Sequence, residues 1–310
     1  MKKKISIVTP CYNEEENVEE LYNQVKAQFD LLPDYDYEHI FIDNASKDKT
    51  VEILTALAMK DKNVKVIVNA KNFGHIRSPF YGLLQAHGDA VMLMVADLQD
   101  PPILIPDFIQ KWEEGNLLVI GVKNKSKENS LMFSLRKAFY LAIDKSSSIE
   151  HISNFTGFGL YDQSFVETLR ELDDPYPYFR GIVAELGSDC YMFNYTQPVR
   201  LKGDTKNNFY TLYDMGMLGF VNYSKLPLRA AAFIGFIIAL VSFVVGLIYL
   251  GYKLLYWDDF NVGMAPVVIG LFFFSSVQLF FIGIIGEYIG SIYTQVRKRP
   301  LVIERKRINF

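Results

Sequence analysis

The amino-acid sequence predicts an α/β domain with a doubly wound, mostly parallel sheet, followed by juxtamembrane helices and two transmembrane helices. Three observations support this fold class. Apolar strand-like runs alternate with helical segments between residues 5 and 95, which is typical of a parallel sheet with helical crossovers. The apolar run 90–95 ends abruptly in Asp97, Gln99, Asp100 and two prolines, and two long uncharged segments lie near the end of the chain.

The elements follow in order along the chain. We expect strands over 5–9, 37–42, 64–68, 90–95 and 117–122, and helices over 14–31, 49–60, 76–86, 131–143 and 165–171. Residues 149–200 mix short strands with that last helix. Asn13 precedes three glutamates and is expected to cap the first helix, and Asp48 is expected to cap the second.

Two spans of a bilayer are predicted at 230–252 and 262–286, because each segment is long and apolar enough to cross ~30 Å of hydrocarbon. A pair of buried helices in a soluble protein is the alternative. Basic residues flank the pair on its outer sides, which indicates a multi-pass membrane protein with both termini in the cytoplasm. We therefore divide the chain into a cytoplasmic α/β domain (1–205), a juxtamembrane amphipathic segment (206–229), a transmembrane hairpin (230–290) and a basic cytoplasmic tail (291–310).

Composition excludes several classes of partner and site. The formal charge of -3 argues against nucleic-acid binding. Cys11 and Cys190 have neither zinc nor disulfide spacing, so we expect two free thiols. Gly283, Gly286 and Gly290 permit close helix packing in the second span, and we expect a homo-oligomer.

Several short motifs occur in an order that resembles glycosyltransferase family 2, and within it the polyisoprenyl-phosphate glycosyltransferases such as bactoprenol glucosyltransferases and dolichyl-phosphate mannose synthase. The matching pieces are VTPCYNE (8–14), IDNASKDKT (42–50), NFGH (72–75), ADLQDPP (96–102), RLKGDTK (200–206) and PLR (227–229). The resemblance extends over nearly the whole chain and implies a GT-A fold, a nucleotide-diphosphate sugar as donor, and Mg²⁺ or Mn²⁺ as cofactor.

The resemblance implies an inverting transfer of one sugar from a UDP-sugar, glucose or another hexose, to undecaprenyl phosphate at the cytoplasmic membrane face. The product would be a polyprenyl-phosphate sugar for modification of envelope glycans. The metal ligands are expected to be Asp97 and Gln99, two oxygen donors on one extended turn, with diphosphate and water completing the shell. The alternative is that residues 97–100 only cap the next helix.

Nucleotide contacts are expected from the loops after the first two strands. Asp43 ends its strand as Asp97 does, so both carboxylates should lie at the carboxyl edge of the sheet, with Asp43 on the base or ribose. By similarity, the loop after the first strand wraps the uracil. It contains Thr9, Pro10, Tyr12 and Glu14, and loop packing is the alternative for Tyr12. Asn72 belongs either to the diphosphate pocket or to a turn that needs Gly74.

The polyprenyl phosphate acceptor is largely dianionic at neutral pH and can attack without a strong base. Positive side chains are expected to hold its phosphate, with solvated surface roles as the alternative: Lys123, Lys125, Arg136, Arg200 and Lys202. Arg200 and Lys206 are also expected to act in catalysis.

The sequence departs from the family pattern at four positions. Val95, Asn44 and Gly157 stand where relatives carry carboxylates, and Lys123 replaces an arginine. Asp162 is a candidate to replace the base missing at position 157. Weaker metal binding or an altered donor preference could follow from these changes.

Two other functions stay open. A non-catalytic membrane adaptor derived from such an enzyme is suggested by Val95 and Gly157. A processive polysaccharide synthase is disfavoured, because the sequence has no Gln-x-x-Arg-Trp motif and two spans are few for an export channel.

Overall fold

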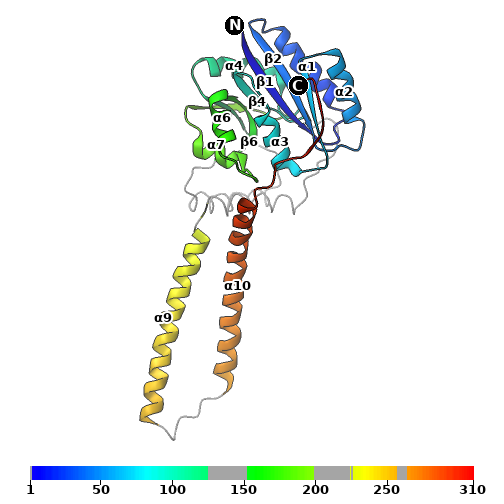
Figure 1. The fold of residues 1–310 in the computed structure, drawn as a ribbon. Coiled ribbons are helices and arrows are strands. Elements are labelled where there is room, and N and C mark those ends of the chain that lie inside the picture. Colours follow the sequence, from blue (N-terminus) through cyan, green and yellow to red (C-terminus); the bar gives the residue numbers. More distant parts are fainter. Residues whose placement is uncertain (1, 125–151, 199–223, 225, 257–263) are drawn as a thin grey trace.

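A computed structural model of the chain describes residues 2–124, 152–198, 224, 226–256 and 264–310. It consists of a sheet domain above a pair of long helices (Figure 1). The strands of the domain are β1 (Lys3–Cys11), β2 (Tyr35–Asp43), β3 (Val64–Asn69), β4 (Ala90–Leu93), β5 (Leu118–Lys123), β6 (Phe155–Asp162), β7 (Cys190–Tyr195) and β8 (Glu304–Ile308). Its helices are α1 (Val18–Asp30), α2 (Thr50–Lys60), α3 (Gly74–Leu84), the short 3₁₀ turn η1 (Pro102–Leu104), α4 (Ile105–Glu113), α6 (Gln163–Glu171) and α7 (Phe179–Leu186).

The eight strands form one mixed sheet in the order β7-β5-β6-β4-β1-β2-β3-β8. The pairs β1·β2, β1·β4, β2·β3 and β5·β7 are parallel, whereas β6 and β8 run antiparallel to their neighbours. The predicted doubly wound, mostly parallel sheet is therefore confirmed. The strands β1 to β4 all end at one edge, which we call the carboxyl edge.

Helices cover both faces of the sheet because alternate strand residues point to opposite sides. One core cluster joins α1, α2 and α4 to residues such as Ile5 and Ile7 of β1. The second cluster joins α3, α6 and α7 to Val8 of β1 and Val91 of β4. Both faces are thus buried, which is why these strands read as continuous apolar runs.

The two apolar segments form the helices α9 (Leu226–Leu255) and α10 (Met264–Val296), which we call the hairpin. Apolar windows over Leu226–Ile248 and Gly270–Val296 are long enough to cross a membrane, and neither window is buried. A soluble protein would bury such helices, so the structure disfavours the alternative of two core helices. The carboxyl edge of the sheet faces the hairpin (Figure 1).

Three predicted segments remain: the juxtamembrane segment, the helix 131–143 and the tail. Of the predicted juxtamembrane segment, the structure describes only residue 224 and the first turn of α9. The predicted helix 131–143 lies outside the described residues. The tail is not a separate basic extension, because β8 pairs with β3 and becomes the last strand of the sheet.

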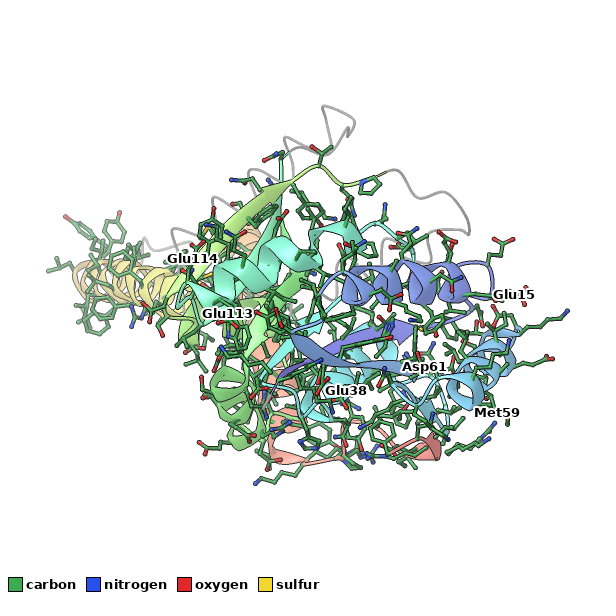
Figure 2. All side chains as sticks on the ribbon, turned by 90° about the horizontal axis from the view of Figure 1, so that it is seen from above. Glu15, Glu38, Met59, Asp61, Glu113 and Glu114 are labelled. Atoms are coloured by element: carbon green, nitrogen blue, oxygen red, sulfur yellow. The ribbon has the colours of Figure 1, made fainter. Side chains whose placement is uncertain are left out.

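The amino edge of the sheet contains a buried charged cluster around Glu38, whose side chain is 2% exposed. Its carboxylate accepts hydrogen bonds from Lys4 at 2.6 Å and Ser6 at 2.6 Å and pairs with Lys65 at 2.7 Å. Figure 2 views the domain from above and shows Glu38 within the domain rather than at its outline. Burial opposes ionisation, but these hydrogen bonds outweigh it and lower the pKa of Glu38 to about 2.

This pKa predicts loss of stability in acid. A carboxyl with a lowered pKa in the folded state stabilises it above the unfolded pKa, and this contribution disappears as the pH falls from about 4.5 toward about 2. We expect Glu38→Gln to lower the free energy of unfolding at pH 7 by about 3 kcal/mol and to flatten its pH dependence below pH 5. Chemical unfolding of the purified protein measures both. Asp30→Asn, which breaks the exposed Lys26–Asp30 pair, is the control and should change little. An unchanged acid slope in Glu38→Gln would contradict the assignment.

Candidate functional site at the carboxyl edge of the sheet

The turn that follows β4, residues 97–100, carries the predicted metal ligands, and we call it the metal turn. Asp97 and Gln99 are half-buried, and Asp97 Oδ1 accepts the backbone N–H of Gln99 at 3.1 Å. Leu98 between them has a left-handed backbone with φ 60°. Left-handed geometry disfavours ordinary side chains, so the surrounding contacts must hold this turn in place.

Asp100 provides much of that support. Its side chain is buried, with Oδ2 accepting the Val95 N–H at 3.2 Å and Oδ1 accepting the Tyr195 hydroxyl at 3.0 Å. Burial raises the pKa of Asp100 to about 6, against the lowering effects of the two hydrogen bonds and of the positive charge of Lys123. Neither η1 nor α4 has a side-chain cap. The alternative in which residues 97–100 only cap the next helix is therefore wrong.

Asp43 ends β2 at the same edge, but its strand does not neighbour β4. The strand β1 lies between β2 and β4, which separates the ends of β2 and β4 by roughly 10 Å. Asp43 is fully buried; Oδ2 accepts the Ser46 N–H at 3.0 Å, whereas Oδ1 has no hydrogen-bond partner in the described residues. Burial raises the pKa of this carboxyl, and hydrogen bonds from Ser46 partly offset the effect.

The loops after β1 and β2 are tied together by hydrogen bonds. Asn13 donates its N–H to Ser46 Oγ at 2.8 Å and accepts the Lys47 N–H at 2.8 Å, while Glu14 N–H donates to Thr50 Oγ1 at 2.9 Å. Asn13 has φ 54° and lies before α1 begins, so its predicted role as the cap of that helix is wrong. Asp48 does accept the Thr50 N–H at 3.0 Å, at the start of α2.

Of the four residues predicted after β1, three lie on this bridged edge. Pro10 lines a cavity described below, Tyr12 is half-buried in the loop, and the Glu14 carboxylate accepts the Asn17 side-chain amide at 2.6 Å. Thr9 does not fit the prediction. Its side chain is fully buried inside β1 and its hydroxyl bonds His39 Nε2 at 2.9 Å, so it faces the core.

Asn44 organises the turn before α3. Its amide nitrogen donates to Asn72 Oδ1 at 3.0 Å and to the Gly74 carbonyl at 3.1 Å, and its oxygen accepts the Phe73 N–H at 2.8 Å. Gly74 has φ 86°, and its N–H donates to Asn72 Oδ1 at 2.8 Å. Of the two alternatives for Asn72, the structure therefore supports a role in the turn that needs Gly74 over one in the diphosphate pocket. The side-chain oxygen of Asn72 already accepts hydrogen bonds from Asn44 and Gly74. The amide at position 44 accounts for the absence of a carboxylate there.

A cavity of about 150 Å³ opens beside the metal turn, between α3, β6 and α7. Val95 and Gly157, two of the three positions where the sequence lacks an expected carboxylate, both line it. Gly157 has φ 103°, so a side chain there would be strained, although a Cβ would be 3.6 Å from Leu93 and Phe179. Most of the remaining wall is apolar, and its polar members are His75, Asp100, Thr156, Tyr178 and Arg180.

Asp162 lies at the opposite edge of the sheet. It pairs with Ala90, the first residue of β4, because β6 runs antiparallel to that strand. Its carboxylate accepts the Ser164 N–H at 2.9 Å and Trp112 Nε1–H at 2.8 Å, and so caps α6. The prediction that Asp162 replaces a catalytic base is therefore wrong.

The positive side chains divide into described and undescribed positions. Lys123 ends β5 at the carboxyl edge, and its charge acts on Asp100. Lys125, Arg136, Arg200, Lys202 and Lys206 lie outside the described residues, so their predicted contacts with the acceptor stay predictions. Among the described residues, no group of three or more His, Cys, Asp or Glu side chains could hold a metal by itself.

The site also contains residues that the motifs did not indicate. Tyr195 reaches the metal turn from β7, and Arg180 reaches the cavity from α7. Neither stands in a motif. Tyr195 reaches the turn through the pairing of β7 with β5, and Arg180 reaches the cavity because α7 packs on β6. The short segment Cys190–Tyr195 gives no signal in the sequence of the strand with which it pairs.

We predict that replacing Asn44 by aspartate destabilises this protein. The new carboxylate would lose both donated hydrogen bonds and place oxygen against Asn72 Oδ1 and the Gly74 carbonyl. We expect Asn44→Asp to lower the free energy of unfolding by about 2 kcal/mol, measured by chemical unfolding. Asn116→Asp, which removes a single bond to the Lys111 carbonyl, is the matched control with a smaller loss. Equal or greater stability of Asn44→Asp would refute this role.

Comparison with solved structures finds glucosyl-3-phosphoglycerate synthase from Mycobacterium tuberculosis, crystallised with Mn²⁺, UDP and phosphoglyceric acid. It is 19% identical, with a TM-score of 0.48, over 71% of this chain and 76% of that chain.

Family models match both halves of the chain. One described as glycosyl transferase family 2 matches residues 6–170, and one described as the GtrB C-terminal hairpin matches residues 226–292. The SfII prophage-derived bactoprenol glucosyl transferase of Shigella flexneri is 34% identical over 98% of both chains. The uncharacterized glycosyltransferase YkcC of Bacillus subtilis is 33% identical over 97% of this chain and 93% of its own length. The chain therefore belongs to glycosyltransferase family 2, and its sheet domain has the GT-A fold.

Proposed function

We propose that this protein is a polyprenyl-phosphate glycosyltransferase that moves one sugar from a UDP-sugar to undecaprenyl phosphate at the cytoplasmic face of the inner membrane. The acceptor class is supported by relatives named bactoprenol glucosyl transferase, which match nearly the whole chain. The observation that carries the proposal is the position of the site. The edge of the sheet with Asp43, Asp97 and the cavity faces the apolar hairpin (Figure 1).

The residues of the metal turn fit a hard divalent cation, Mg²⁺ or Mn²⁺. Asp97 and Gln99 offer a carboxylate and an amide oxygen on one turn, and such oxygens suit these ions. Two protein ligands leave room for diphosphate oxygens, which agrees with the lack of a larger acidic cluster in the described residues. A bound cation would neutralise the charge that develops on the departing UDP.

The nucleotide is expected to lie over the ends of β1 and β2. The buried Oδ1 of Asp43 has no partner in the described residues, and an N–H or O–H of the base or ribose would satisfy it. Tyr12 and Glu14 stand on the neighbouring loop, which five hydrogen bonds fix to the loop after β2. A loop held in this way is preorganised for binding and loses little freedom when the nucleotide arrives.

We infer that the proposed reaction needs no base on the cavity wall. Asp100 is the one carboxylate that lines it among the described residues, and both of its oxygens already accept hydrogen bonds. A phosphate acceptor needs no such base, because it is already ionised at neutral pH. One of its oxygens attacks the anomeric carbon, a carbon–oxygen bond forms, and the bond to UDP breaks with its electron pair leaving on UDP. A single in-line attack inverts the configuration.

The adaptor alternative keeps one specific observation in its favour, because Val95 and Gly157 both line the same cavity. Calorimetry separates the two functions. We expect UDP to release heat with the purified protein in a Mn²⁺-dependent manner, whereas an adaptor with a collapsed pocket would give none. No observation on the described residues favours a processive synthase. The homo-oligomer stays a prediction.

The functional prediction concerns Asp97. We expect Asp97→Asn to reduce sugar transfer by about a hundredfold or more while the protein stays folded, because it removes the charged ligand of the turn. Membranes containing the protein are incubated with a panel of radiolabelled UDP-sugars, and the lipids are extracted. Label in an acid-labile lipid fraction identifies both the reaction and the sugar.

Asp162→Asn is the matched control, since it changes the same chemical group at the opposite edge of the sheet. It should retain transfer and lose only stability. Full activity of Asp97→Asn, or loss of activity in both variants, would refute the assignment of the site.

A further inference from the structure

The end of the chain forms a link between the hairpin and the far edge of the sheet. Residues 299–310, which we call the strap, leave the end of α10, pass α3 and continue as β8 (Figure 1). Val302 is buried, and the Ile303 carbonyl accepts the Ala70 N–H at 2.8 Å before the β3·β8 pairing starts. The strap is therefore part of the domain core and its sheet.

The direction of β8 determines which edge of the domain faces the hairpin. The strand is antiparallel to β3, with Glu304 opposite Asn69 and Ile308 opposite Val66. Because Asn69 is the last residue of β3, the strap joins the sheet at its carboxyl edge. This edge carries the metal turn and the cavity.

The length of the link limits how far that edge can move from the hairpin. From Val296, the last residue of α10, to Ile303 there are seven peptide steps, which span at most roughly 25 Å when fully extended. As long as β8 stays paired, the carboxyl end of β3 cannot leave this radius.

The strap also contacts the helix that forms one wall of the cavity. Tyr81 of α3 donates its hydroxyl to Glu304 Oε1 at 2.7 Å, and Arg307 bonds both Glu304 and Gln85. Leu301 packs against the core cluster that contains Phe80 and Leu83. These two α3 residues line the cavity, so the strap supports the cavity wall from behind.

The last two residues fasten the strap at the opposite edge of the domain. Asn309 donates its side-chain amide to the carbonyls of Ala58 at 2.6 Å and Val64 at 2.8 Å. The Phe310 ring lies under the charges of Lys65 and Arg307, at 5.0 Å and 4.7 Å from its centroid.

Other contacts of α10 with the domain are weaker. Gln295 of α10 bonds Asp174 at 3.1 Å, and just beyond the helix the exposed Lys298–Asp173 pair at 3.5 Å is worth at most about 1 kcal/mol. The strap is therefore the stronger of the connections described between α10 and the sheet domain.

We propose that the strap is a positioning element, which holds the carboxyl edge at a fixed height and tilt above the membrane so that a membrane-bound acceptor meets the cavity. The inference rests on the proposed transfer to a lipid phosphate. An acceptor confined to the bilayer cannot follow a domain that drifts away, and small misplacements of reacting groups reduce rates strongly. A water-soluble acceptor can follow it.

The test lengthens the connection between α10 and β8 without changing any residue that makes the contacts of the strap. A flexible Gly-Ser segment of about twelve residues, inserted between Arg299 and Pro300, adds about 20 Å of average reach. The same segment appended after Phe310 is the control. Transfer is measured to long-chain polyprenyl phosphate in vesicles and to a short-chain polyprenyl phosphate in detergent.

We expect the insertion to reduce transfer to the vesicle acceptor by about tenfold or more, with unchanged transfer to the short-chain acceptor, UDP affinity and unfolding temperature. Unchanged transfer to both acceptors would overturn the proposal. An equal loss of transfer with both acceptors would also overturn it, because it indicates a merely structural role. If the parent protein labels neither acceptor, the proposed function fails instead.

A second measurement decides the positioning role without any activity. A donor dye on Met59→Cys, in a Cys190→Ser background, reports energy transfer to an acceptor dye in the vesicle lipids. Met59 is 75% exposed and lies at the rim of the domain (Figure 2). We expect lower energy transfer in the insertion variant than in the control, and equal transfer in both would contradict the proposal.

Discussion

The antiparallel pairing of β8 with β3 is the interaction on which the arrangement of this protein depends. Parallel strands joined by helices all end at one edge, so their polar ends gather there whatever follows in the chain. An added strand can run in either direction. Because β8 runs antiparallel and follows α10 after a few residues, the edge with Asp43 and Asp97 faces the apolar hairpin. The first and last strands of the chain, β1 and β8, thereby belong to the same sheet.

Support for the site comes from residues that do not touch a substrate in the proposed reaction. Asp100 and Tyr195 hold the metal turn, Asn44 holds the turn before α3, and Asn13 ties two loops together. Each of these side chains makes hydrogen bonds within the protein. By contrast, Asp43 Oδ1, which we propose to meet the nucleotide, makes no hydrogen bond in the described residues. Ligand-binding edges of this kind are held rigid by their neighbours, which reduces the entropy lost on binding.

The sequence was sufficient for the elements whose signal is local. Strands buried on both faces read as apolar runs, so β1 to β5 were predicted within a few residues, and the hairpin was evident from length and the absence of charge. The strand β4 ends at Leu93, earlier than predicted, because the Val95 N–H bonds Asp100 instead of a neighbouring strand. What failed depended on contacts between distant parts of the chain. Glu304–Ile308 is mostly charged, as edge strands often are, and therefore resembles a solvated tail. Asp162 follows an apolar strand just as Asp97 does, but the antiparallel direction of β6 places it at the other edge.

Hydrogen exchange of the full-length protein in vesicles, with and without UDP and Mn²⁺, tests the central claim most directly. The account predicts slower exchange in the loops after β1 and β2 and in the turn after β4, with no change at the amino edge around Glu38. Slower exchange at the amino edge, or unchanged exchange at the carboxyl edge, would contradict a nucleotide site that faces the membrane.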